Sequence, residues 1–203
     1  MRISPARLYR RLRFGPPIVV VSGLPRSGTS MMMGMLRAAG LDLVTDGART
    51  ADPSNPEGYF ELEHVKTLDK TGRHPWLADC RGRSVKIISF LLPYLPEGHN
   101  YRVIFMRRDL REVIASQNAM LTSRSESVGP DAAVLAGQLQ DDLSRVERVL
   151  CGRRCFEVLD VSYNQAVADP SGEATRVARF LGGDLDVRAM AAVVNPALHR
   201  NRE

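Results

Sequence analysis

The chain has 203 residues, 44% of them hydrophobic and 25% charged, a balance typical of a globular domain and unlike collagenous, disordered or membrane-spanning chains. This length predicts one domain, and the longest apolar runs fall far short of the roughly 20 residues that cross a bilayer. The net charge is +5. Five arginines with no acidic residue among them precede Phe14: Arg2, Arg7, Arg10, Arg11 and Arg13. Removing these five from the 28 basic residues leaves 23, equal to the 23 acidic ones, so the remainder is neutral and a nucleic-acid partner is not expected.

The charge distribution predicts a basic, solvated N-terminal tail over residues 1–14 and a single domain over residues 15–203. A contact with an anionic surface, or a targeting segment, is the alternative for the tail. No secretory hydrophobic stretch follows it. The three cysteines and four histidines lack metal-ligand or disulfide-framework spacing. We therefore expect a cytoplasmic protein without a metal.

Four runs rich in valine and isoleucine predict buried strands, at residues 18–22, 84–89, 103–106 and 156–159. Helical patterns alternate with them, at 30–39, 59–70, 109–120 and 131–150, and two short helices follow, one from about 171 to 182 and one ending before Pro196. Continuous apolar strands that alternate with helices predict a three-layer α/β domain, with a central parallel sheet flanked by helices. The stretch from Asp46 to Tyr59 is rich in Asp, Pro, Gly and Asn and predicts a long loop that serves as a substrate lid.

The most informative segment runs from Val19 to Ser30 and reads VVVSGLPRSGTS. Gly23 and Gly28 permit a tight turn between strand and helix, where backbone N–H groups and the helix N-terminus attract an anion. The two glycines have the spacing of a Walker P-loop, but Thr29 stands where that loop has its lysine, and the cation is Arg26. The pattern disfavours a nucleoside triphosphate and favours a shorter charged group; a glycine-proline turn that binds nothing is the alternative.

A second pattern, RVIFMRRDLREVIAS, covers residues 102–116. Arg108 follows a strand at the edge where open α/β sheets bind ligands, and arginine suits phosphate recognition. Asp109 and Glu112 have capping-box spacing, and Ser116 follows two turns into the helix. A structural ion pair is the alternative role of Arg108.

Together these patterns resemble the sulfotransferases that use 3′-phosphoadenosine 5′-phosphosulfate (PAPS), a P-loop-type fold. In that family a Pro-Lys/Arg-Ser-Gly-Thr-Thr/Ser loop holds the 5′-phosphosulfate, which implies this role for Pro25, Arg26, Ser27, Gly28, Thr29 and Ser30. An arginine and a serine eight residues later bind the 3′-phosphate, which implies this role for Arg108 and Ser116. A weaker match places Tyr163 beside the adenine. The loop from Asn55 to Glu61 is similar to that of short bacterial members.

One departure concerns the general base. Cytosolic hydroxysteroid- and phenol-type relatives have a Lys-x-His segment after a strand, with histidine as the base, whereas this chain has Lys86-Ile87-Ile88. Other relatives use a glutamate in the long-loop region, which favours Glu61 as base, and Lys86 is expected to assist catalysis. The alternatives for the base are Glu57, Glu63 and His64; helical spacing over 59–70 would turn Glu63 away from Glu61.

The resemblance implies transfer of a sulfuryl group from PAPS to a hydroxyl or amine of a small-molecule or carbohydrate acceptor, with 3′,5′-bisphosphoadenosine (PAP) as product and no metal. Two alternatives remain at this stage. One is a P-loop small-molecule kinase with Asp160 as a metal ligand, and the other is a catalytically silent nucleotide-binding protein.

Overall fold

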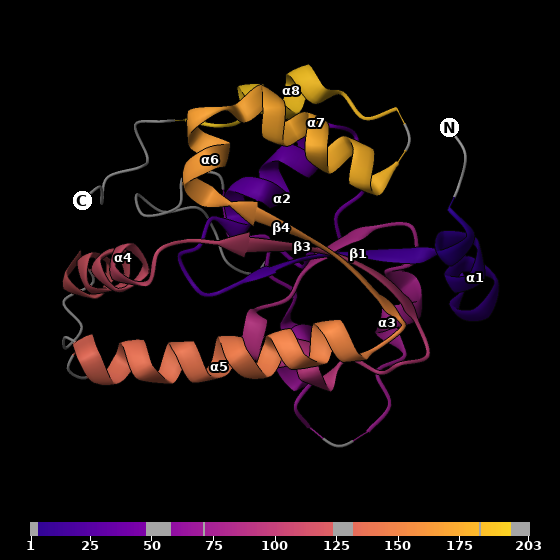
Figure 1. Cartoon of the computed structure of the whole chain (residues 1–203), viewed down its shortest axis with the longest axis horizontal. Helices are drawn as coiled ribbons and strands as arrows, with labels where there is room; N and C mark the ends of the chain where they lie inside the picture. The colour runs from indigo at the N-terminus through magenta and orange to yellow at the C-terminus, as the bar shows by residue number, and fades with distance from the viewer. Residues whose placement is uncertain (1–3, 48–57, 71, 124–131, 183, 196–203) are drawn as a thin grey trace.

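A parallel sheet of four strands forms the centre of the computed structural model, which describes residues 4–47, 58–70, 72–123, 132–182 and 184–195. The strand order is β2-β1-β3-β4, with β1 Pro17–Gly23, β2 Ser84–Lys86, β3 Asn100–Arg107 and β4 Phe156–Ser162. Figure 1 shows β1, β3 and β4 side by side. In the register, Val20 lies opposite Val85 of β2 and Val103 of β3. Because every strand is parallel, the carboxyl ends of all four share one edge of the sheet.

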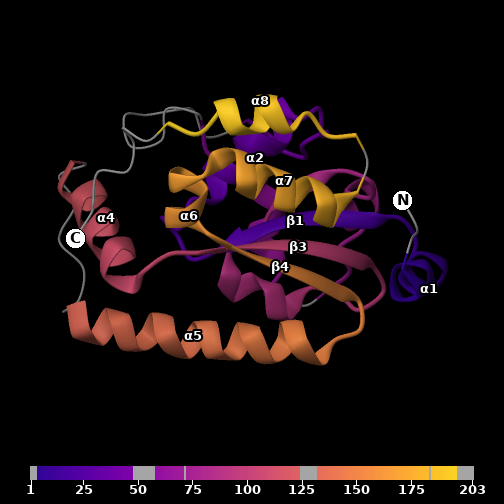
Figure 2. The ribbon, with the colours of Figure 1, turned by 45° about the horizontal axis from the view of Figure 1, so that its top comes forward.

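Helices cover both faces of this sheet (Figures 1 and 2). One face carries α2 Thr29–Ala38, α6 Tyr163–Ala168, α7 Pro170–Leu181 and α8 Val187–Ala192; the other carries α3 Trp76–Asp79, α5 Ala132–Gly152 and the 3-10 helices η1 Glu63–Thr67 and η2 Ser89–Tyr94. Ile18 and Val20 point into the core on the α5 side, and Val19 and Val21 into the core on the α2 side. The strands are therefore buried on both faces, which explains their unbroken apolar runs and confirms the expected three-layer α/β fold.

The strands and most helices lie where the sequence predicts them, including α4 Leu110–Ser123, but the helix expected over residues 59–70 is wrong. That region holds only the five-residue η1. The backbone N–H of Val65 donates to Leu62 O, and that of Leu68 donates to Val65 O, so the turns close over three residues instead of four. The second predicted strand is also shorter than expected, because η2 begins at Ser89.

Residues 5–14 differ from the expected solvated tail, since they form helix α1, Pro5–Phe14. Ser4 caps its start by accepting a hydrogen bond from the Arg7 N–H at 3.3 Å. The Arg7 guanidinium pairs with Glu157 of β4 at 2.7 Å and donates to Phe180 O of α7 at 2.6 Å. In the sequence this basic segment has no acidic residue nearby, which suggests a solvated tail. In the structure its acidic partner, Glu157, lies on a strand 150 residues from Arg7.

Residues 48–57, most of the expected lid, lie outside the described part of the chain, so the lid remains a prediction. None of the helices in the described ranges has the length and apolarity needed to span a membrane.

Candidate functional site

The segment between β1 and α2 is a tight turn built around Gly23, Arg26 and Gly28. Gly23 has φ +148°, and a Cβ there would meet Met106 O of β3 at 2.7 Å; Gly28 has φ +96°, and a Cβ there would meet the Tyr163 ring at 2.5 Å. Arg26 is a non-glycine residue with φ +67°. Such a backbone costs about 1–3 kcal/mol and persists only where the surroundings hold it.

Hydrogen bonds inside the turn stabilise this shape. The buried Ser27 hydroxyl donates to Leu24 O at 2.7 Å, and the Ser27 N–H donates to the same oxygen at 3.2 Å. Pro25, Thr29 and Ser30 are half-buried, and α2 begins at Thr29 with Gly28 as its N-cap. The N-terminal amides of α2 therefore open directly from the turn, which is the arrangement that binds anions at helix N-termini.

Two residues of the segment 102–116 contact this turn: Arg108 and Ser116. The Arg108 guanidinium donates from Nη1 to the Arg26 carbonyl oxygen at 3.0 Å, across the left-handed residue. In the other direction, Arg26 Nε donates to the Ser116 hydroxyl of α4 at 3.1 Å. The two motifs that the sequence analysis singled out separately are thus one structural unit at the carboxyl edge of β1 and β3.

Arg108 also forms a buried ion pair, the structural role that the sequence left open as an alternative, and its partner is Glu112. Its Nε lies 2.8 Å from Glu112 Oε2, and the side chains are only 6% and 10% exposed. The other Glu112 oxygen accepts a hydrogen bond from Asn164 Nδ2 of α6 at 2.9 Å. Asp109 caps α4 by accepting a hydrogen bond from the Arg111 N–H at 2.8 Å. The Glu112 carboxylate, which would complete the expected capping box, pairs with Arg108 instead. The four-residue spacing of Arg108 and Glu112 was a usable signal; nothing in the sequence indicated Asn164.

Tyr163 completes this cluster from the end of β4. The Arg108 guanidinium carbon lies 4.3 Å from the centre of the Tyr163 ring, close enough for a cation–π contact. The same ring packs against Gly28, where a Cβ would collide with it. Tyr163 is 7% exposed and forms part of the core on the α2 side, so it supports the turn as well as bordering it.

Lys86 and Glu61 lie together at the end of β2. The Lys86 ammonium donates to Tyr59 O and lies 3.8 Å from Glu61 Oε1, with side-chain exposures of 14% and 31%. Lys86 pairs in register with Val21 of β1, just before the turn, so this pair sits at the same sheet edge as Arg26. Phe60 is buried, has φ +50° and packs its ring 4.9 Å from the Arg37 guanidinium carbon of α2. The structure therefore brings the expected base and lysine into one ion pair.

The alternatives for the base are placed differently. Glu63 points to solvent, is 67% exposed and pairs with Lys66 at 2.8 Å. His64 is exposed, with its ring 6.2 Å from that of Trp76. Glu57 lies outside the described residues. Of the three candidates that can be compared, only Glu61 contacts a residue at the carboxyl edge of the sheet.

The metal ligand required by the kinase alternative is paired elsewhere. Asp160 accepts from Arg107 Nε at 2.7 Å, and Arg107 also pairs with Glu147 at 2.7 Å. Burial lowers the pKa of Arg107, but the hydrogen bonds and charges of Asp160 and Glu147 outweigh it and raise that pKa. Among the residues with described positions, no cluster of three or more His, Cys, Asp or Glu side chains could hold a metal.

Comparison with known proteins identifies the group to which the chain belongs. The sequence profile of the Sulfotransferase family matches residues 60–186, which is more than half of the chain. The chain belongs to the sulfotransferase family. The match contains Arg108, Ser116 and Tyr163, whereas the turn from Gly23 to Ser30 precedes it.

A solved sulfotransferase structure agrees with this family's fold. The sulfotransferase domain of the olefin synthase from Synechococcus PCC 7002 is 18% identical, with 90% of this chain and 86% of that chain covered and a TM-score of 0.55. An unliganded sugar kinase from Janibacter sp. HTCC2649 is 16% identical, with 90% and 98% covered and a TM-score of 0.45. Comparison with curated protein sequences gives no significant match.

Proposed function

We propose that this sulfotransferase-family protein transfers a sulfuryl group from PAPS to a hydroxyl or amine of a small-molecule or carbohydrate acceptor, as a cytoplasmic enzyme that needs no metal. The observation that carries the proposal is the joining of two anion-binding motifs: Arg108 donates to the Arg26 carbonyl, and Arg26 donates to Ser116. A PAPS molecule has anionic groups at both ends of its ribose, and this unit offers two guanidinium groups beside a helix N-terminus.

The chain's residues suit a 5′-phosphosulfate on one side of this unit. The turn lacks Cβ atoms at Gly23 and Gly28, and the backbone amides from Ser27 to Ser30 lead into α2. Arg26 and these amides would stabilise the negative charge that grows on the phosphate as the bond from sulfur to the bridging oxygen breaks. Arginine and oriented amides thus supply the compensation that a magnesium ion supplies to a γ-phosphate.

Arg108 and Ser116 would bind the 3′-phosphate on the other side, with Tyr163 beside the adenine. The buried Glu112 keeps the Arg108 guanidinium in place through Nε, while Nη1 bonds to Arg26 O. An arginine has five N–H donors, so these two contacts leave others for a ligand.

Glu61 is proposed as the general base and Lys86 as its catalytic partner. The acceptor oxygen forms its bond to sulfur as PAP departs, and the acceptor proton passes to the Glu61 carboxylate. The Lys86 ammonium, 3.8 Å from that carboxylate and bonded to Tyr59 O, orients Glu61 and adds positive charge at the sheet edge. No histidine is needed for this step.

Thermal unfolding with nucleotides tests the donor. PAP without magnesium should raise Tm, with about 2.7 kcal/mol of stabilisation at 100 times its dissociation constant. Magnesium-ATP should do much less, because Thr29 stands where a P-loop kinase has its lysine. Better stabilisation by magnesium-ATP would support the kinase alternative instead. Incubation with PAPS and an acceptor library, read by mass spectrometry for products heavier by one SO3, separates an enzyme from a silent nucleotide-binding protein.

A further inference from the structure

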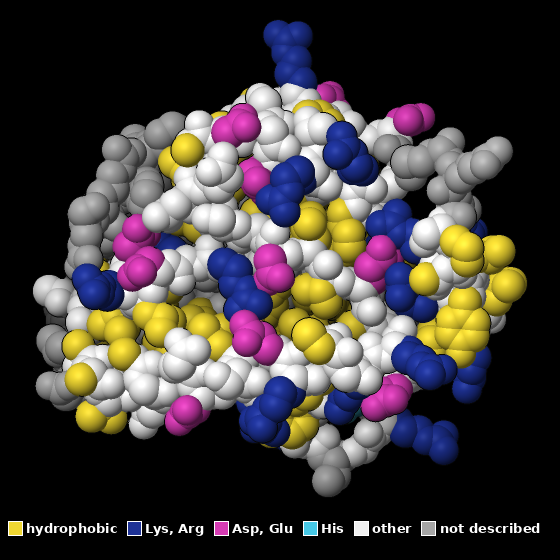
Figure 3. Space-filling model, in the orientation of Figure 1, with side chains coloured by type: hydrophobic (Ala, Val, Ile, Leu, Met, Phe, Trp, Pro, Cys, Tyr) yellow, Lys and Arg dark blue, Asp and Glu magenta, His cyan; other side chains and the backbone are white. Residues whose placement is uncertain are grey.

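Helix α1 presents most of its large apolar side chains to solvent. None of its ten residues is buried. Phe14, at its end, is half-buried and packs against the core, whereas three other large apolar side chains are exposed: Leu8 48%, Tyr9 50% and Leu12 79%. At about 100° per residue, Leu8, Leu12, Pro5 and Tyr9 fall within an arc of about 100°. Arg11 and Arg13 border this arc on its two sides, and both are exposed. Figure 3 shows the resulting apolar patch over α1, with Lys and Arg side chains beside it.

The opposite side of α1 holds the helix in this orientation. Arg7 and Arg10 both pair with Glu157, at 2.7 and 3.1 Å, and these side chains are 16–19% exposed. At the helix end, Asn100 donates to Gly15 O at 3.1 Å. A surface helix normally turns its apolar stripe inward and its charges outward. Here the ion pairs of Arg7 and Arg10 turn the charged side inward, and Leu8, Tyr9 and Leu12 face outward.

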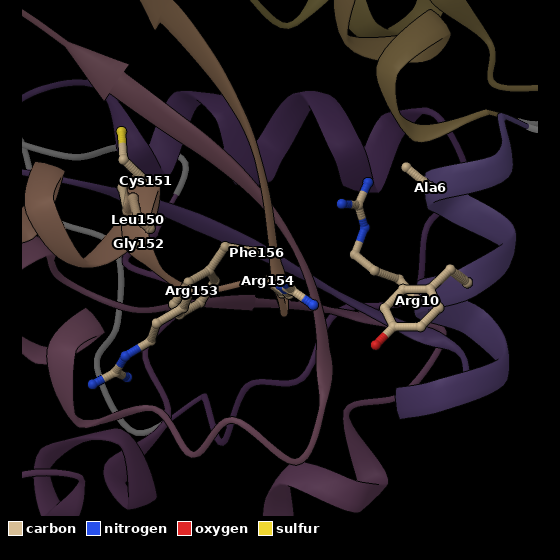
Figure 4. A pocket seen from close by; sticks show the side chains of 9 residues that line it. Ala6, Arg10, Leu150, Cys151, Gly152, Arg153, Arg154 and Phe156 are labelled. Atoms are coloured by element: carbon tan, nitrogen blue, oxygen red, sulfur yellow. The ribbon is translucent and has the colours of Figure 1, made fainter.

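A cavity of about 420 Å³ adjoins the apolar arc (Figure 4). It is lined by Tyr9 and Arg10 of α1, by Arg153 and Arg154 from the turn between α5 and β4, and by Phe156 at the start of β4. Tyr9 belongs to both the arc and the cavity. This region lies where β4 begins, whereas the candidate catalytic residues follow the strand ends, so the two surfaces are on opposite edges of the sheet.

We propose that α1 and this arginine-lined cavity form a docking surface for an anionic lipid bilayer. The apolar arc enters the boundary between headgroups and acyl chains, and Arg11 and Arg13 contact headgroup phosphates on its two sides. At the cavity, Arg153 pairs with Glu97 at 3.2 Å and donates to Leu95 O, so the exposed Arg154 is the residue that contacts a further headgroup phosphate. A bilayer fits better than a second copy of the chain, because two such faces would bring like charges together. One ten-residue helix also offers far less than the roughly 800 Å² per partner of a stable protein interface.

Vesicle flotation with the full chain tests this surface. Binding is expected to vesicles of phosphatidylglycerol and phosphatidylcholine in equal amounts, to weaken as salt is raised, and to be absent with phosphatidylcholine alone. R11Q/R13Q should bind about 30-fold more weakly. R179Q/R188Q removes the same charge from exposed positions on α7 and α8 and should bind like the wild type.

The apolar arc is tested separately by L8S/L12S, which should lose at least about 10-fold in vesicle affinity. Its matched control is F90S/V134S, which alters side chains that are 47% and 54% exposed on η2 and α5 and should leave binding unchanged. Unchanged PAP stabilisation in all four variants would show that the fold is intact. Equal binding by R11Q/R13Q and R179Q/R188Q, or no binding by the wild type, would overturn the proposal. A wild-type dimer that L8S/L12S converts to a monomer would also overturn it, in favour of self-association.

Discussion

Removing the Arg108 side chain should lower both the stability of the fold and the affinity for PAP. The two losses can be measured separately. In the R108A variant, Glu112 keeps its charge at 10% exposure without the guanidinium 2.8 Å away. Breaking a buried ion pair in this way costs about 3–5 kcal/mol, a large share of the about 5–15 kcal/mol by which domains are stable. The lost hydrogen bond to Arg26 O adds to this, since that bond supports a left-handed residue.

The R108A/E112Q double variant separates the two effects. A glutamine at 112 is neutral and can still accept the hydrogen bond that Asn164 donates at 2.9 Å. The double variant should therefore recover at least about half of the lost free energy of unfolding, because no uncompensated charge remains buried. PAP affinity should stay about 1.5–3 kcal/mol below the wild type in both variants, the range for hydrogen bonds to charged groups.

Urea unfolding measures the free energy of unfolding, and isothermal titration with PAP and with AMP measures the affinity for each nucleotide. AMP lacks the 3′-phosphate, so its affinity should fall much less than that of PAP. If R108A/E112Q regained PAP affinity together with stability, Arg108 would act on the ligand only through the fold. An R108A protein that lost under about 1 kcal/mol of stability would refute the reasoning from the buried pair.

Four further predictions follow from the site and the core. R26A should lower turnover by about 100- to 1,000-fold and weaken PAP far less, because the loop amides remain to bind the ground state; pre-steady-state kinetics would show this as a loss in kcat. E61Q should lose at least about 100-fold in kcat while still binding PAP, whereas E63Q, altered at a 67% exposed position, should stay within a few-fold of the wild type. Native protein should react with Ellman's reagent at the exposed Cys151 only, because burial raises the pKa of Cys80 to about 11 and its thiol is fully buried. Since that pKa is above its unfolded value of 9.0, the free energy of unfolding should fall as pH rises from 9.0 to about 11, which urea titrations across that range would detect.

The parts of the fold that the sequence predicted well are those whose pattern is local. The run Ile18 to Val21 is buried on both faces, and glycines follow it at two of the three positions in the turn where the backbone takes positive φ; the third is Arg26. Both signals lie within a dozen residues of the chain. Strand β1, its turn and the start of α2 could therefore be located without any knowledge of tertiary contacts.

The region from 59 to 70 shows where such patterns mislead. Leu62, Val65 and Leu68 recur every three residues, a spacing that fits one face of an α-helix and also fits a 3-10 helix. In the structure the three residues face the core from η1 and its flanks, so the spacing marks a core-facing side but does not distinguish an α-helix from a 3-10 helix. Glu61 ends up apart from Glu63 because it precedes η1 and turns to Lys86.

Ion pairs between residues far apart in the sequence could not be predicted from local sequence patterns. Nothing near Arg7 or Arg10 indicates an acidic partner, since Glu157 lies on a strand near the other end of the chain. Likewise, Asn164 holds Glu112 across 52 residues. Such charged and polar side chains follow no periodic pattern in the sequence, so only the folded structure shows which of them pair.

The structure shows a second role for the motif residues, which is to support the turn. Arg26, Arg108, Ser116 and Tyr163 are expected to contact a ligand, yet each already contacts another part of the site. The Arg108 hydrogen bond to the Arg26 carbonyl helps to hold a backbone conformation that costs about 1–3 kcal/mol on its own. The spacing of Arg108 and Ser116 therefore serves the shape of the turn as much as the recognition of a phosphate. A site whose donors are held by one another before the ligand arrives loses less entropy on binding, which is the physical reason for building both anion-binding motifs into one connected unit.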